Sequence, residues 1–471
     1  MSVTRIFQQA SDSAPRYWRL ERFDTEFNLN IFISPILPGV EHPPPYHLSC
    51  YLLPNSQYAQ TLITASDCEN PNVEENEIRA IAEDVLSRLE KWSMGRDLTS
   101  IFKGVTIGSR FRLDDTTVGG APGVWLAPNQ ELQRRYLPVS RLRELWGPYI
   151  TELPPLLDFD SLRSTSRLHN SVSEVLLPSG EVAIFKGVVR VVAAMYNEIR
   201  ELLRIPPHPN IMSKPPYLVI RQVPGLKEPV VCGFILKRLS GGSLLGYLSN
   251  LSPAHPPPLP TTVKWIRQII SALLHLYGPA RSYHSALRLD NLILDEDGNV
   301  VLADFEQRGT SRRWLPPPLW QENQPGPALE NSDWAQSPVN PAKMPKGIFY
   351  SCPPHGYHKE FIRASERERQ GFEAYSLAKV MWCLFEGETN DLSLMDLSAE
   401  ELEMRRADGT ALKDAIFPNF RRTPARMRYW IWLCTRQSRE WGETRCMCDA
   451  GDEGLVCSES GSRKGGILEG M

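Results

Sequence analysis

The sequence lacks the features that mark several large classes of protein. It has no apolar run near the roughly 20 residues that a membrane-spanning helix needs, so we expect no membrane partner. Its nine cysteines form no disulfide-type framework, which favours a reduced, intracellular protein. The formal net charge is -3 at pH 7, and without a basic excess we expect no nucleic-acid partner.

The first 24 residues contain no apolar segment of the kind found in secretory signals. The chain also has no long basic cluster, so an intracellular protein, either cytoplasmic or nuclear, is expected. Proline is abundant, with 40 of 471 residues, and this predicts many loops and interrupted elements. The length fits more than one domain.

Residues 1–150 are predicted to form a small α+β domain. Apolar segments indicate strands within residues 28–37, 47–54 and 59–65. A helix is predicted over residues 70–93, where Ile78, Ile81, Ala82, Val85 and Leu89 recur at helical spacing. This apolar stripe is typical of a face packed on a core. The domain offers no catalytic constellation, and its role stays open.

Residues 155–440 show strand patterns first and helix patterns later, which is typical of a two-lobed α+β domain. A hairpin is predicted over residues 168–186 around the turn "PSG". Helices are predicted over residues 195–205, 261–278, 372–387 and 427–441, and the tryptophans of the last are expected in the core. The proline-rich insertion 319–347 is predicted to be a loop, and the polar tail 443–471 to be disordered.

Four motifs follow one another in this region: "VAIFK", "YNEIRELL" ahead of "HPNI", "HSALRLDN" and "ADFEQRG". In this order they resemble the motifs of a eukaryotic protein kinase domain. The phrases "DFEQRG", "PPHGY" and "YSLAKVMWCLFEG" are similar to kinase-like proteins of filamentous fungi. The resemblance implies a β-rich N-lobe at 155–239 and a helical C-lobe at 240–440, preceded by the α+β domain.

The resemblance also implies a nucleotide site. Lys186 would neutralise the α- and β-phosphates of ATP, and Glu198 on the following helix would orient it. Leu236 would take the gatekeeper position. Backbone groups from Lys237 to Leu239 would meet the adenine edge.

The catalytic loop of a kinase corresponds to "HSALRLDN". His284 would have a packing role, and Arg288 replaces the lysine that contacts the γ-phosphate. Asn291 and Asp304 would hold Mg²⁺, because a hard cation prefers oxygen ligands. Ala286 stands where the catalytic aspartate is expected, and alanine can neither orient the substrate hydroxyl nor accept its proton.

Other positions also depart from the kinase pattern. The expected phosphate loop, "RLHNSVSEV", contains no glycine, so backbone N–H groups cannot approach phosphates as closely. Glu306 replaces the glycine of D-F-G, where it could either repel phosphate or hold metal. Pro318 replaces the glutamate of A-P-E. Glu373 replaces the buried aspartate that braces the catalytic loop, and could still brace it.

These residues predict a kinase-like protein that binds ATP and Mg²⁺ and acts as a pseudokinase, a signalling or scaffolding module with an unknown protein partner. The alternative is a weakly active Ser/Thr-type protein kinase, because positioning and electrostatics supply most phosphoryl-transfer catalysis. A small-molecule phosphotransferase would also need the missing aspartate. A protein that binds no nucleotide stays open as well, given the absent glycines.

Overall fold

The computed structural model shows an α+β protein whose chain divides into two compact units. The first unit contains residues 1–195 and 214–238, and the second contains residues 196–213 and 239–471. Residues described by the structure are 17–24, 30–51, 71–113, 123–147, 150, 152–188, 191–251, 256–307, 314, 365–389 and 420–437. These two units do not coincide with the predicted domains 1–150 and 155–440. Whether either predicted domain folds by itself stays a prediction.

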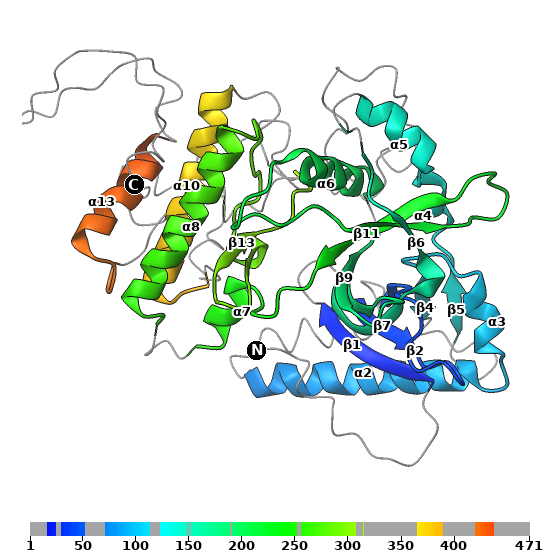
Figure 1. The fold of residues 1–471 in the computed structure, drawn as a ribbon. Coiled ribbons are helices and arrows are strands. Elements are labelled where there is room, and N and C mark those ends of the chain that lie inside the picture. Colours follow the sequence, from blue (N-terminus) through cyan, green and yellow to red (C-terminus); the bar gives the residue numbers. More distant parts are fainter. Residues whose placement is uncertain are drawn as a thin grey trace, which may run out of the picture. The chain divides into compact units, whose positions relative to one another are not determined.

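The first unit begins with a five-stranded mixed sheet in the order β1-β2-β3-β4-β5 (Figure 1). Only the β3–β4 pair is parallel. The strands are β1 Trp18–Asp24, β2 Asn30–Pro35, β3 Leu48–Tyr51, β4 Arg110–Leu113 and β5 Val124–Ala127. The strands predicted within residues 28–37 and 47–54 are therefore confirmed, whereas the one predicted within 59–65 lies outside the described residues.

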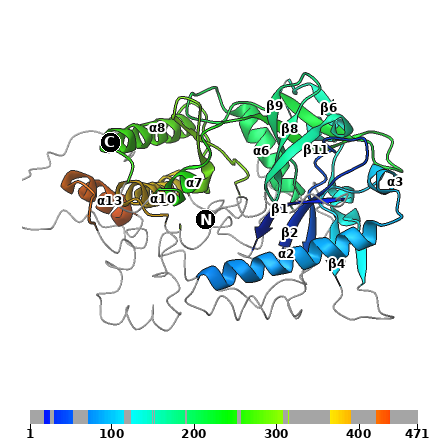
Figure 2. The ribbon, with the colours of Figure 1, turned by 90° about the horizontal axis from the view of Figure 1, so that it is seen from below.

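The long helix α2 (Pro71–Ser93) runs along β1 and β2, as Figure 2 shows. Its predicted apolar stripe is buried at four of five positions, and Ile78 near the start of the helix is half-buried. Polar contacts also fix the helix, because the Trp18 indole donates to Ser93 Oγ at 2.8 Å. Three short helices complete this part of the unit: α3 Leu98–Lys103, α4 Gln130–Arg135 and α5 Val139–Trp146.

A six-stranded sheet in the order β6-β10-β11-β9-β8-β7 forms the rest of the first unit. Neighbouring strands are antiparallel except for β6 and β10. The strands are β6 Leu156–Asp158, β7 Arg163–His169, β8 Val172–Leu176, β9 Val182–Lys186, β10 Tyr217–Arg221 and β11 Val230–Lys237. The predicted hairpin around "PSG" is the β8–β9 pair, so that prediction is confirmed.

The two sheets of the first unit share a buried interface. His47 Nε2 lies 2.9 Å from Ser173 Oγ on β8, and its ring contacts Phe185 on β9. Burial lowers the pKa of His47 well below its usual value, with Arg167 acting in the same direction. A second contact comes from β10, where Arg221 Nη1 donates a hydrogen bond to the backbone carbonyl of Val105. The segment before residue 150 is thus packed directly on the six-stranded sheet.

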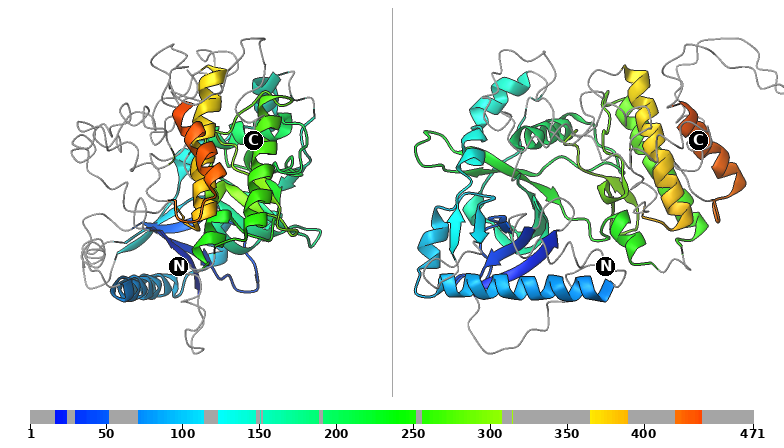
Figure 3. Two further views of the ribbon diagram at one scale, coloured as in Figure 1. Left: turned by 90° about the vertical axis from the view of Figure 1, so that its left-hand side faces the viewer. Right: turned by 180° about the vertical axis from the view of Figure 1, so that it is seen from behind.

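The second unit is mainly helical, and three of its helices lie side by side in both views of Figure 3. They are α8 Leu259–Tyr277, α10 Glu366–Glu386 and α13 Ala425–Gln437. The remaining elements are the short helices α7 Leu244–Ser249 and η4 Leu289–Asn291 and the hairpin β12 Leu292–Leu294 with β13 Val300–Leu302. Helix α6 (Val192–Arg204) crosses the boundary between the units, which falls after Met195.

The predicted ends of two helices agree with the structure. Gly278 caps α8, and Gly387 caps α10 in the left-handed region at φ 75°, which glycine adopts without strain. The tryptophans of α13 were expected in the core, and for Trp432 this is wrong, because its side chain is 47% exposed. Trp430 is half-buried, and Trp441 lies outside the described residues.

No helix in the described ranges is both long and apolar enough to cross a membrane. Pro318, the insertion 319–347 and the tail 443–471 also lie outside those ranges, so the predictions made for them stay as they were.

Candidate functional site

Lys186 ends β9 and is buried in the first unit, with 6% of its surface exposed. Its cross-strand partners are Val172 on β8 and Phe234 on β11. Leu236 pairs with Ile184, two positions before Lys186. Because alternate residues of a strand share a face, Lys186 and Leu236 lie on the same face of the sheet.

The segment after β11 carries the predicted adenine-edge residues. Lys237 is the exposed last residue of the strand, and Leu239 is half-buried two positions later. Gly241 follows, and its N–H donates to the Leu294 carbonyl at 3.0 Å. A Cβ on Gly241 would lie 2.5 Å from the Cβ of Leu294, so this close approach requires glycine.

The position of the expected phosphate loop is a two-residue turn, Asn170–Ser171, between β7 and β8. Arg167 holds this turn. Its Nη2 donates to the Asn170 carbonyl at 2.8 Å, its Nε to the His169 carbonyl at 3.2 Å, and its Nη1 to the Leu48 carbonyl. Burial lowers the pKa of Arg167 to about 9, so the guanidinium stays charged at neutral pH. The turn is therefore fixed by a side chain that the sequence patterns did not single out.

His284 begins the segment that resembles a catalytic loop, and it is 1% exposed in the second unit. Its Nε2 lies 2.9 Å from the Ala303 carbonyl, and its ring meets that of Phe305 edge-on at 5.0 Å. Burial lowers the pKa of His284 to about 4, so the ring is neutral at pH 7. These contacts agree with the packing role expected for it.

Asn291 closes the same loop. Its side-chain amide donates to the Ala286 carbonyl at 2.8 Å, and its own carbonyl accepts from the Ala303 N–H at 2.9 Å. Ala286 is buried, with 6% exposure. Arg288 Nε lies 2.9 Å from Asp290 Oδ1, so the one aspartate of the loop is engaged in an ion pair.

Glu373 on α10 braces this loop, as the sequence suggested it could. Its Oε1 accepts the backbone N–H of His284, while Oε2 is buried with no hydrogen-bond partner among the described residues. Burial raises the pKa of Glu373 well above its usual value, and the His284 N–H offsets this only in part. Burial therefore favours the neutral, protonated form of the Glu373 carboxyl.

Replacing Glu373 by glutamine is expected to change how stability depends on pH. A carboxyl with a raised folded-state pKa stabilises fully below its unfolded pKa, whose reference value is 4.5, and this contribution is lost as pH rises. The free energy of unfolding of the wild type, relative to Glu373→Gln, should therefore fall between pH 4.5 and pH 7. Urea unfolding across this range measures it, with Glu366→Gln at the exposed start of α10 as control. Parallel curves for wild type and Glu373→Gln would contradict the assignment.

Three carboxylates converge beside the loop: those of Glu198 on α6 and of Asp304 and Glu306 after β13. One oxygen from each lies within 4.8 Å of the others. Glu198 and Glu306 are buried, and Asp304 is half-buried. Close, buried carboxylates raise one another's energy unless a cation neutralises them, and hard oxygen ligands suit Mg²⁺. The donor set therefore fits a divalent cation.

The sequence predicts Asp304 and Asn291 as metal ligands and Glu198 as the partner of Lys186, and it leaves the role of Glu306 open. The structure adds Glu306 to the cluster. Asn291 Nδ2 donates to the Ala286 carbonyl, and the role of Asn291 Oδ1 as a metal ligand stays a prediction. Glu198 Oε1 also accepts the Phe305 N–H at 3.3 Å, which ties α6 to this segment. The acidic residue two positions after Asp304 was the available sequence signal.

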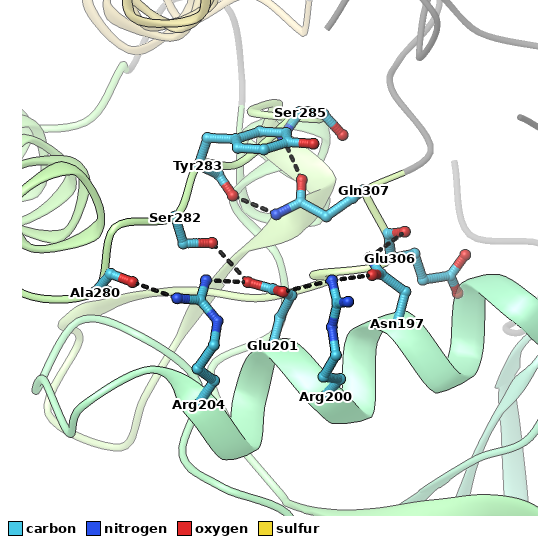
Figure 4. Close-up of polar contacts among 10 residues, drawn as sticks. All are labelled: Asn197, Arg200, Glu201, Arg204, Ala280, Ser282, Tyr283, Ser285, Glu306 and Gln307. Atoms are coloured by element: carbon cyan, nitrogen blue, oxygen red, sulfur yellow. Dashed lines mark hydrogen bonds and ion pairs between the residues drawn. The ribbon is translucent and has the colours of Figure 1, made fainter. Parts of the chain in front are cut away.

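A polar network around this cluster was not predicted. Figure 4 shows it joining α6, residues 280–285 and residues 306–307. At its centre Glu201 pairs with Arg204 at 2.6 Å and Arg200 at 3.0 Å, and accepts from Ser282 Oγ at 2.7 Å. Burial opposes the charge on Glu201, but the two arginines outweigh it, and its pKa is lowered.

No protein-family model matches this sequence, and a search of curated proteins finds no match.

Proposed function

We propose that the chain is a kinase-like protein that binds a divalent cation together with ATP and transfers phosphate slowly or not at all, so that it acts as a signalling or scaffolding module. The observation that carries the proposal is the convergence of Glu198, Asp304 and Glu306 beside a loop with Ala286 at the base position. The chain keeps acidic ligands for a cation and lacks the group that would accept the substrate proton.

The order of elements supports a two-lobed kinase-like fold. Strands β7, β8 and β9 are followed by α6, then β10 and β11, and afterwards by the helices and the β12–β13 hairpin. The resembling motifs lie at the places that this order gives them: "VAIFK" on β9, "YNEIRELL" on α6, and "HSALRLDN" just before β12. The glutamate brace from α10 to His284 is a further support.

The residues divide the chemistry among them in this proposal. Glu198, Asp304 and Glu306 hold Mg²⁺, which would neutralise charge on the phosphates of ATP. Lys186 meets the α- and β-phosphates, and its pairing with Glu198 stays a prediction. Ala286 offers no group to the substrate hydroxyl, and Asp290 is held by Arg288. A missing base costs about 10²–10⁴-fold in rate.

A weakly active protein kinase is the second candidate. The ordered backbone of residues 284–291 favours it. Asn291 binds the Ala286 carbonyl, Glu373 accepts the His284 N–H, and the His284 ring contacts the Ala303 carbonyl. Phosphoryl transfer depends largely on positioning and electrostatics, and this loop is well positioned. In this case the wild-type chain would transfer phosphate to protein hydroxyls at a low rate.

A thermal-shift titration of the full chain with Mg·ATP tests the proposal. A ligand that binds only the folded state stabilises it by about 2.7 kcal/mol at 100 times its Kd. We expect the melting temperature to rise with Mg·ATP in the wild type, and the rise to be lost in Asp304→Asn and in Lys186→Ala.

The control for this titration is Asp295→Asn, in the turn between β12 and β13, where Asp295 caps its own turn through Asn299. This variant should melt at a lower temperature without ligand and keep the full rise with Mg·ATP. A wild type that shows no rise at millimolar Mg·ATP would overturn the proposal.

A further inference from the structure

Gln307 bridges two segments of the second unit through its side-chain amide. Its Nε2 donates to the Tyr283 carbonyl, and its Oε1 accepts the Ser285 N–H at 3.1 Å. The residue is 5% exposed. Both the NH₂ group and the oxygen of the Gln307 amide therefore bind the backbone of residues 283–285, directly before Ala286. Figure 4 shows these two bonds.

The backbone of the segment 304–307 is in an unusual conformation. Asp304 has φ 68° and Gln307 has φ 59°, which are left-handed values that residues with a Cβ rarely adopt. Such residues persist where surrounding contacts hold them. Asp304 and Gln307 stand on either side of Phe305 and Glu306 in the sequence. Their backbone angles therefore set the direction in which the Asp304 and Glu306 side chains leave this short turn.

Helix α6 holds the same turn from the other side. Asn197 Nδ2 donates to the Glu306 carbonyl at 3.3 Å, and Arg200 Nη2 donates to Asn197 Oδ1 at 2.8 Å. Arg200 also donates to Glu201, which accepts from Ser282 next to Tyr283. The contacts therefore form a closed circuit, and Gln307 is the link between the turn and residues 283–285.

We infer that Gln307 is the positioning residue of the acidic cluster, and that it holds the turn so that Asp304 and Glu306 converge with Glu198 before any cation binds. This inference rests on the proposed function, since it assigns a role toward the cation of that site. Gln307 acts through the backbone and does not touch the cation. In this arrangement a divalent cation binds in the absence of nucleotide.

Mn²⁺ alone is the probe, because its binding is read directly from water-proton relaxation or electron paramagnetic resonance of the full chain. Replacing Gln307 by alanine should weaken Mn²⁺ binding about 10–100-fold, the usual effect of removing a residue that orients metal ligands. The titration is performed well below the melting temperature of each variant. Affinity of the folded protein is then measured separately from its stability.

Two further variants make the test specific. Gln307→Gly removes the amide and also relieves the left-handed backbone, so it folds more readily than the alanine variant and should bind Mn²⁺ as weakly. Gln268→Ala is the matched control, because Gln268 makes a comparable bridge, from Asn299 Oδ1 to the Val300 N–H, at 2.9 Å on each side. It should lose stability and bind Mn²⁺ like the wild type.

The outcomes separate the inference from the proposed function. Wild-type affinity in Gln307→Ala and Gln307→Gly overturns the inference and leaves the proposed function standing. Equal losses in Gln268→Ala and Gln307→Ala overturn it too, since the effect would then be general. A wild type that binds no Mn²⁺ at millimolar concentration overturns the inference, and the Mg·ATP titration then decides the proposed function separately.

Discussion

Replacing Ala286 by aspartate is expected to raise ATP turnover by about 10²–10⁴-fold, the usual contribution of a positioned general base. The loop needs no rebuilding for this change. The Ala286 carbonyl is already held by the Asn291 amide at 2.8 Å, and the preceding His284 is fixed by Glu373 and by the Ala303 carbonyl. The new carboxylate therefore starts from an ordered backbone.

Turnover is measured as ADP release from Mg·ATP with a generic protein substrate. Ala286→Asn is the matched control, because asparagine has the size of aspartate and cannot accept the proton. Its rate should stay at the wild-type level. If Ala286→Asp binds Mg·ATP and still releases no more ADP than the wild type, the base is not the missing element.

Replacing Arg167 by leucine is expected to destabilise the first unit by about 3 kcal/mol or more. The change removes the Arg167 hydrogen bonds to three carbonyls, a buried one at Leu48 and partly buried ones at His169 and Asn170. Hydrogen bonds to charged groups contribute about 1.5–3 kcal/mol each, and a buried acceptor left unsatisfied adds its desolvation cost. The guanidinium also lies over the Phe32 ring at 4.2 Å, and this contact is lost with it.

Urea unfolding at pH 7 measures the loss. Arg167→Lys should recover only part of it, since an ammonium cannot reproduce the planar fork that reaches three carbonyls. Arg163→Ala, at an exposed position of the same strand, should change stability by less than about 0.5 kcal/mol. A cost as small for Arg167→Leu would show that other groups hold the turn.

Regular elements of this protein follow from local patterns in its sequence. The stripe on α2 and the apolar face of α8 predict helices because each buries a side chain every three or four residues. The β8–β9 hairpin follows from its alternating residues and the "PSG" turn. These signals are local, and local sequence suffices for them.

The site was only partly predictable, because its new features depend on contacts between distant segments. Glu306 looked like a loss of glycine, and its convergence with Glu198 appears only once α6 and β13 are placed. Gln307 and Arg167 act through backbone groups, which carry no residue-type signal. Residue type can also mislead: Trp432 is a large apolar residue on a helix, and its side chain is nevertheless 47% exposed.

The bond from Arg167 to the Leu48 carbonyl also constrains when the first unit can form during synthesis. Leu48 precedes Arg167 by 119 positions. At about 5–20 residues per second, Leu48 is synthesised roughly 6–24 s before Arg167. Through that interval the Phe32 ring and the Leu48 carbonyl have no guanidinium to cover them. This contact between β3 and β7 therefore forms only after strand β7 has been made.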